Sequence, residues 1–129
     1  TGSIPSNVGL LTKLNALALY ENSLTGFIPS QIGLLTNLDY LSLGGNSLSS
    51  SIPSDVGLLT NSFELDFSSN PLTGSIPSQL GLLSNLYDLW LHDTMVTGSI
   101  PQSLCSSGFS ASIECDRVEC DCCSCAIRV

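Results

Sequence analysis

Short stretches of alternating apolar and polar residues recur along the chain at one constant spacing. The stretches are Leu17-Ala18-Leu19, Leu41-Ser42-Leu43, Leu65-Asp66-Phe67 and Leu89-Trp90-Leu91. A period of two residues predicts a strand with one buried face. Because every strand holds the same place in its repeat, stacking the repeats sets the strands side by side in a parallel sheet, about 4.8 Å apart.

The second half of each repeat carries an Ile-Pro pair that predicts a return path opposite the sheet. The isoleucines are Ile4, Ile28, Ile52, Ile76 and Ile100. The proline holds the residue before it in an extended conformation and fixes its own φ. A short helical turn is expected next, with an N-cap serine at Ser6, Ser30, Ser54 and Ser78 and a terminating glycine at Gly9, Gly33, Gly57 and Gly81.

Two further positions of the repeat carry special residues. Asn22, Asn46 and Asn70 follow the strands at one fixed offset, and a buried carboxamide there is expected to form a ladder that pairs backbone groups of adjacent repeats. Thr94 takes the next ladder position, which predicts that the regular stack ends there. Ser50 stands where Gly26, Gly74 and Gly98 stand in other repeats, so we expect that this position does not require a positive φ in every repeat.

The period divides the chain into segments. Residues 1–10 are expected to be the tail of a truncated repeat, so the chain is predicted to be a fragment. Four repeats of the same kind follow, at 11–34, 35–58, 59–82 and 83–104, and residues 105–129 form a Cys-rich C-terminal cap.

The phrase LxGxIPxxLGxLxx, present in four near-complete copies, resembles the plant-type leucine-rich repeats of receptor-like kinase ectodomains, receptor-like proteins and polygalacturonase-inhibitor-type proteins. The tail CSSGFSASIECDRVECDCCSC is more similar to the short Cys-rich ends of microalgal repeat proteins. The resemblance implies a right-handed leucine-rich-repeat solenoid, with a parallel β-sheet on the concave face and short 3-10 or helical turns on the convex face. It also implies a non-catalytic recognition role, often at the cell surface.

All six cysteines lie in the cap: Cys105, Cys115, Cys120, Cys122, Cys123 and Cys125. Their even number and terminal position favour disulfides in an oxidising compartment, and 15 pairings are possible. A metal cluster is the alternative, but zinc sites usually show two separated Cys hooks. We therefore expect no metal and no cofactor. One repeat period beyond Leu89 and Leu91 come Ile113 and Cys115, which predicts a cap strand centred on Ile113 with Cys115 in the core.

The composition limits the partners. The formal net charge is −8 and only 11% of the residues are charged, so nucleic acid is not an expected partner because no basic patch is available to neutralise phosphates. The sequence contains no apolar run of the length that crossing a bilayer requires, and a membrane span is not expected in this chain. The cysteines favour a secreted, extracellular or cell-surface location.

Strand residues that do not enter the core are expected to face the concave surface. Their columns place acids around the single tryptophan, and Glu114 and Asp116 of the cap are expected to extend the acidic area. The candidate ligand-binding residues are Trp90, His92, Tyr40, Glu64, Asp66, Asp88 and Asp93, with Tyr20 as a weaker candidate. Exposed aromatic residues ringed by polar groups are typical anchors for partners.

An enzyme is not expected. Glu64 and Asp88 are predicted to lie in neighbouring strands at a separation that resembles the carboxylate pair of retaining glycosidases, but an open sheet surface gives both acids the same environment. The favoured function is recognition of a protein, peptide or glycan. The alternatives are a structural or cell-wall adhesion protein, or a binder of regular lattices such as ice through the convex column Ser3, Ser51, Ser75 and Ser99, which Phe27 interrupts.

Overall fold

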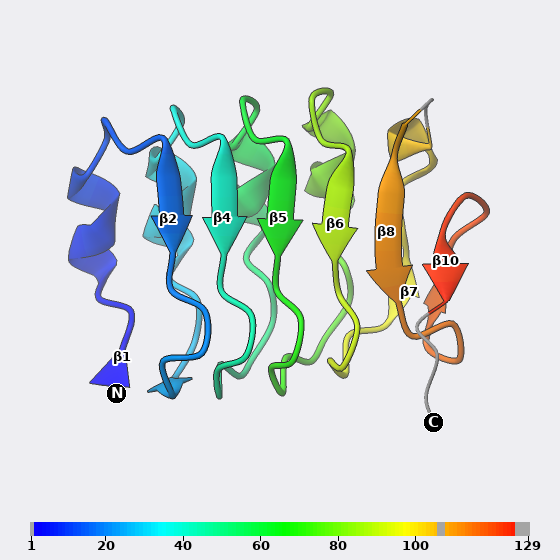
Figure 1. The fold of residues 1–129 in the computed structure, drawn as a ribbon, viewed down its shortest axis with the longest axis horizontal. Helices are drawn as coiled ribbons and strands as arrows, with labels where there is room; N and C mark the ends of the chain where they lie inside the picture. Colours follow the sequence, from blue (N-terminus) through cyan, green and yellow to red (C-terminus); the bar gives the residue numbers. More distant parts are fainter. Residues whose placement is uncertain (1, 106–107, 126–129) are drawn as a thin grey trace.

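The computed structural model describes residues 2–105 and 108–125. The repeats stack side by side into a solenoid, with a parallel sheet on one face (Figure 1). The sheet order is β10-β8-β6-β5-β4-β2. Its strands are β2 (Ala16–Ala18), β4 (Tyr40–Ser42), β5 (Glu64–Asp66), β6 (Asp88–Trp90), β8 (Ser110–Ile113) and β10 (Ser124–Cys125). The predicted leucine-rich-repeat architecture is therefore confirmed.

Short 3-10 turns lie behind the sheet, as Figure 1 shows. They are η1 (Ser6–Leu10), η2 (Ser30–Leu34), η3 (Ser54–Leu58), η4 (Ser78–Leu82) and η5 (Gln102–Leu104). The expected serine N-caps are wrong, because the preceding proline is the N-cap residue and no side chain caps these five turns. Proline suits this position because its fixed φ is compatible with the start of the turn, and because a backbone N–H there would have no partner within the turn.

The glycines of these turns do not terminate them, contrary to expectation. Gly33 lies inside η2 and is buried. A Cβ atom there would come within 2.5 Å of the backbone oxygen of Asp55 in the next turn. The glycines are therefore needed because successive turns pack closely.

The core lies between the sheet and the 3-10 turns. Leu41, Leu43, Leu65 and Phe67 point inward from the central strands and are fully buried. The isoleucines of the Ile-Pro pairs close the core from the opposite side and are also buried. In the first repeat, by contrast, Leu17 and Leu19 are only partly buried, because no earlier repeat packs against them in the structure.

The cap strand differs in register from the prediction. Leu65 pairs with Leu89 at the regular repeat period, but Leu89 pairs with Ala111, which comes before Ile113, the partner that the period predicts. The turn η5 has three residues where η1 to η4 have five, and this shortens the repeat. Ala111 and Ile113 consequently enter the core, whereas Cys115 lies in the following turn and is exposed, so its predicted core position is wrong.

A second, interrupted parallel ladder runs along the side of the solenoid. It contains the pairs β1 (Gly2–Ser3) with β3 (Leu24–Thr25) and β7 (Gly98–Ser99) with β9 (Val118–Glu119). Isolated bridges join Phe27 to Ser49 and Ser75 to Thr97. Next to this ladder Ser50 has a φ of 67°, so the expectation that this position does not require a positive φ in every repeat is wrong. The path of the backbone imposes that conformation whichever residue stands there.

Of the three asparagines after the strands, Asn46 and Asn70 bond to backbone groups of neighbouring repeats, whereas Asn22 is exposed and its Nδ2 donates to the Tyr20 carbonyl of its own repeat. The Asn46 side-chain oxygen accepts the N–H groups of Asn22 and Leu24, and its Nδ2 donates to carbonyls of Leu19 and Leu43. Asn70 bonds in the same way, accepting the N–H of Leu48 and donating to the Leu43 carbonyl. An exposed second row, Asn37, Asn61 and Asn85, donates to the Thr12, Thr36 and Thr60 carbonyls.

The cap replaces the asparagine ladder by other side chains. Thr94 is buried and its hydroxyl donates to the Leu91 carbonyl. The Glu114 carboxylate accepts the N–H of Asp93 at 2.7 Å, and Arg117 donates to the Thr94 carbonyl at 3.0 Å. Longer charged side chains from the cap thus satisfy backbone groups of the last regular repeat.

Among the described residues, no helix has the length and apolar character that crossing a membrane requires.

Candidate functional site

The concave sheet surface carries the aromatic and acidic residues that the sequence analysis selected. Trp90 lies at the end of β6, between Asp66 of β5 and Ser112 of β8 in the strand register. Its side chain is 38% exposed. The His92 ring meets it edge to face, with 5.8 Å between the ring centroids. Trp90 thus presents a partly exposed aromatic surface that His92 supports from one side.

His92 has an unusual environment. Its side chain is partly buried, and the Nδ1 atom is buried with no hydrogen-bond partner among the described residues. An unpaired buried nitrogen lowers stability, since the hydrogen bond to water that it would make in the unfolded chain is lost. The contact that joins His92 to this surface is the one between its ring and that of Trp90.

Three carboxylates lie near Trp90, those of Glu64 and Asp66 on the neighbouring strand β5 and that of Asp88 on β6 itself. Glu64 stands opposite Asp88, and Asp66 stands opposite Trp90. Partial burial raises the pKa of Glu64 above the usual value of a glutamate, and the charges of Asp88 and Asp66 raise it further. The three acids thus form a local area of negative potential that favours positively charged groups.

Asp66 is held in place by two serines. Its Oδ1 atom accepts the backbone N–H of Ser68 at 2.9 Å and the Ser68 hydroxyl at 2.6 Å. Its Oδ2 atom accepts a longer bond from the Ser42 hydroxyl, at 3.4 Å. The carboxylate is thereby turned toward the neighbouring repeat, where it lies over the backbone of Gly44.

A hollow of about 340 Å³ opens on the surface at Gly44 and Gly45. We call it the glycine-floored hollow; its lining residues are Tyr20, Glu21, Tyr40, Ser42, Gly44, Gly45, Asp66, Ser68 and Ser69. Tyr20, Tyr40 and Asp66 are among the binding residues that the sequence predicts for this face, but the sequence pattern did not lead us to expect a hollow. The sequence does contain an indication of the hollow, because Gly44 and Gly45 occupy the positions that Tyr20 and Glu21 occupy one repeat earlier.

The predicted site residues do not all gather at one point. Tyr40 and Asp66 line the glycine-floored hollow, whereas Trp90 and His92 form the pair two strands away. Asp93 lines a different hollow, of about 400 Å³, beside Arg117 at the turns that follow the strands. The cap does not extend the acidic surface in the way expected, because Glu114 is buried at 4% exposure and its carboxylate accepts the backbone N–H of Asp93.

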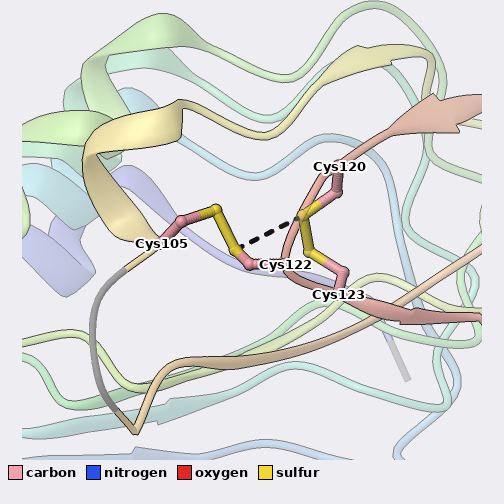
Figure 2. The surroundings of a disulfide bond; sticks show 4 residues. All are labelled: Cys105, Cys120, Cys122 and Cys123. Atoms are coloured by element: carbon pink, nitrogen blue, oxygen red, sulfur yellow. Dashed lines mark hydrogen bonds between the residues drawn. A yellow bond between two sulfur atoms is a disulfide. The ribbon is translucent and has the colours of Figure 1, made fainter.

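The described cysteines of the cap are oxidised. Figure 2 shows one disulfide between Cys105 and Cys122 and another between Cys120 and Cys123. The sulfur atoms of Cys120 and Cys122 lie 3.8 Å apart, which brings the two bridges into contact. Cys115 is also disulfide-bonded, and the side chain of Cys125 lies outside the described residues. Because a disulfide sulfur is not a thiolate, these bonded cysteines are not metal ligands in this state.

Comparison with known families agrees with the repeat geometry. The model of the leucine-rich repeat family matches residues 37–59 and 63–83. Together with the parallel sheet and the 3-10 turns, this match shows that the chain has the leucine-rich-repeat fold.

Solved structures relate it more narrowly to plant repeat proteins. The ectodomain of the plant membrane receptor kinase GASSHO1/SCHENGEN3 from Arabidopsis thaliana, in complex with CASPARIAN STRIP INTEGRITY FACTOR 2, is 36% identical with a TM-score of 0.80, over 86% of this chain and 13% of that chain. The plant peptide hormone receptor RGFR1 in complex with RGF2 is 35% identical with a TM-score of 0.80, over 96% of this chain and 19% of that chain.

A plant ice-binding protein is 40% identical with a TM-score of 0.77, over 88% of this chain and 37% of that chain. This chain therefore spans a small part of each of these proteins. The resemblance to plant-type leucine-rich repeats is confirmed. A comparison with curated proteins gave no match.

Proposed function

We propose that this chain is a non-catalytic recognition module that binds a protein, peptide or glycan ligand on its concave face, in an extracellular or cell-surface setting. The observation that carries the proposal is the partly exposed Trp90 beside three carboxylates on a rigid sheet. A rigid aromatic residue loses little conformational freedom on binding, and truncating such an anchor typically costs about 2 kcal/mol or more.

The carboxylates define the kind of partner. Glu64, Asp66 and Asp88 favour a ligand that carries positive charge or hydrogen-bond donors, and they speed its association at low salt. A peptide ligand is favoured because two of the similar structures are plant receptors in complex with RGF2 and with CASPARIAN STRIP INTEGRITY FACTOR 2. The oxidised cap supports an extracellular setting, since disulfides persist in oxidising compartments.

The proposal is tested by finding a ligand and locating its contact surface. Candidate peptides, proteins and glycans are screened against the immobilised protein, and the affinity of any binder is then measured for Trp90→Ala. The matched control is Phe27→Ala, because Phe27 is also an exposed aromatic residue but lies in the ladder on the side of the solenoid. Affinity should fall about 30-fold or more for Trp90→Ala and stay unchanged for Phe27→Ala. The opposite result would overturn the concave-face proposal.

The second candidate is a lattice binder, because a regular Ser/Thr surface runs along the side ladder. Thr25, Ser49, Thr73 and Thr97 form one exposed column, and Ser3, Ser51, Ser75 and Ser99 form the next. The similarity to a plant ice-binding protein also favours this candidate, although Phe27 interrupts the second column. Ice-recrystallisation inhibition that Ser75→Tyr abolishes and Trp90→Ala leaves unchanged would make lattice binding the function.

A further inference from the structure

The floor of the glycine-floored hollow is formed by two glycines, at positions where the neighbouring repeats have residues with side chains. Gly44 aligns with Tyr20 and Ser68, and Gly45 aligns with Glu21 and Ser69. Residues from three adjacent repeats line the resulting hollow. The hollow opens to the concave surface and has a volume of about 340 Å³.

Two acidic side chains, Asp66 and Glu21, lie close to the two glycines from the adjacent repeats on either side. A Cβ atom on Gly44 would lie 2.8 Å from an Asp66 carboxylate oxygen, and one on Gly45 would lie 2.9 Å from the Cγ of Glu21. Any larger residue at either position would displace the acid that covers it. Asp66 retains acceptor capacity at Oδ2, where its bond to Ser42 is long, at 3.4 Å.

Aromatic rings complete the walls. Tyr20 is 55% exposed and Tyr40 is partly buried, and both line the hollow. Tyrosine faces attract cations and stack against the planar guanidinium of arginine, which also pairs with carboxylates through two parallel N–H donors. Among the residues that line the hollow, the charged ones are acids, so an anionic ligand would be repelled.

We propose that the glycine-floored hollow receives a basic side chain of a peptide ligand, an arginine above all, between Tyr20 and Tyr40 and against the carboxylates of Glu21 and Asp66. The proposal rests on the proposed function, namely that the concave face binds such a ligand, and it names the chemistry of one subsite.

The subsite also sets the spacing within the ligand between the basic residue and the residue that contacts Trp90. Trp90 is two strands and two residues away from the hollow, about 12 Å from strand geometry, which an extended peptide spans with about three or four residues.

The probe for the subsite is N-acetyl-arginine amide, and its neutral isostere N-acetyl-citrulline amide is the matched control ligand. The amide signals of the ¹⁵N-labelled protein are followed by NMR as each compound is added. The signals of Gly44 and Gly45 should shift with the arginine probe, and the citrulline compound should bind about tenfold more weakly because it cannot pair with the carboxylates as a cation. Raising the salt concentration should weaken the arginine probe.

Variants locate the binding to the hollow. Glu21→Gln removes an exposed charge, Tyr20→Ala removes an exposed wall, and Gly44→Ala fills the floor beneath Asp66. Each should weaken the arginine probe at least about threefold, whereas Phe27→Ala on the side ladder should not change its affinity. Circular dichroism shows whether each variant is folded, and the Glu21→Gln result remains decisive if Gly44→Ala does not fold, since Glu21 is on the surface.

Three outcomes would overturn the subsite. They are an absence of shifts at Gly44 and Gly45, equal binding of the arginine and citrulline compounds, and reproduction of the same shifts by calcium chloride, which would make the hollow a cation site. The experiments distinguish failure of the subsite from failure of the proposed function. A peptide whose binding is lost in Trp90→Ala but unchanged in Tyr20→Ala and Glu21→Gln would remove the subsite and leave recognition on the concave face standing.

Discussion

The side-chain oxygen of Asn46 accepts the backbone N–H of Asn22, its counterpart one repeat earlier, at 2.9 Å. The same oxygen accepts the N–H of Leu24, and the Asn46 amide donates to the Leu19 carbonyl of that earlier repeat. One buried carboxamide thus ties the inward turn of its own repeat to the repeat before it. The stack depends on this pairing because the Asn46 carboxamide is buried and the backbone groups that it meets are partly shielded from water.

Asn46→Ala should therefore lower the free energy of unfolding by about 2–4 kcal/mol, since leaving buried backbone groups unpaired costs roughly 1–3 kcal/mol each. The matched control is Asn61→Ala. Asn61 also donates to a backbone carbonyl of the preceding repeat, but it is exposed, so water replaces the lost bond and the cost should stay below about 1 kcal/mol. Urea unfolding of the two variants measures the difference, and equal losses would contradict the role assigned to Asn46.

Ser50→Gly should stabilise the protein. Ser50 has a φ of 67°, in the left-handed region, where a Cβ atom introduces strain of about 1–2 kcal/mol. Glycine avoids this strain but loses about 0.5–1 kcal/mol through the freedom of the unfolded chain, so a net gain between zero and about 1.5 kcal/mol is expected. The control is Ser49→Gly, one residue earlier at a β-bridge with Phe27, where glycine brings its entropic cost and removes a long, exposed bond from the Ser49 hydroxyl to the Gly26 carbonyl, so this variant should be destabilised. A lower melting temperature for Ser50→Gly would show that the positive φ is not strained.

Glu64→Gln should raise the melting temperature at pH 7. The pKa of Glu64 is raised by burial and by the charges of Asp88 and Asp66, so the folded state disfavours the ionised carboxylate more than the unfolded chain does. The penalty is present above the folded-state pKa and disappears as the pH falls through that value toward the ordinary glutamate pKa.

Because Glu64 is only partly buried, we expect a gain of about 2 °C or less at pH 7 and none at pH 3. Differential scanning calorimetry at both pH values measures it, and Asp121→Asn in the cap controls for the change in net charge. A gain that persists undiminished at pH 3 would contradict the electrostatic cause.

The first repeat should open more readily than the central ones. In the sheet, β2 has a single neighbour, β4, and Leu10 and Leu11 beside it are 76% and 52% exposed. Hydrogen exchange should be faster in β2 than in β5, because an edge strand with partly exposed leucines has fewer contacts to break.

The same exposed edge should favour self-association, and light scattering at increasing concentration detects it. Uniform protection of β2 and β5 in a monomeric protein would contradict both expectations. Lys13→Glu, a charge change at this end of the stack, should shift association without changing the protection of β5.

The sequence by itself determined the repeated architecture. The recurrence of Leu17, Leu41, Leu65 and Leu89 at one period specified the strands and their register, because each position of a repeat has the same neighbours in the next repeat. The same alignment placed Trp90 beside Asp66. These features depend on the residue pattern within one repeat and on contacts between adjacent repeats, and both recur with the repeat period.

Tertiary structure decided the places where the period fails or where side chains adjust to one another. The short turn η5 shifted the register of the cap strand, so that Ala111 entered the core and Cys115 did not. The pairing of Cys105 with Cys122 depends on which sulfur atoms that register brings together. The hollow at Gly44 exists because Asp66 is turned by Ser68 and the rings of Tyr20 and Tyr40 stand beside it. A linear pattern specifies which residues are neighbours, but the space left between them depends on side-chain orientation and on the length of each turn, which only the folded chain defines.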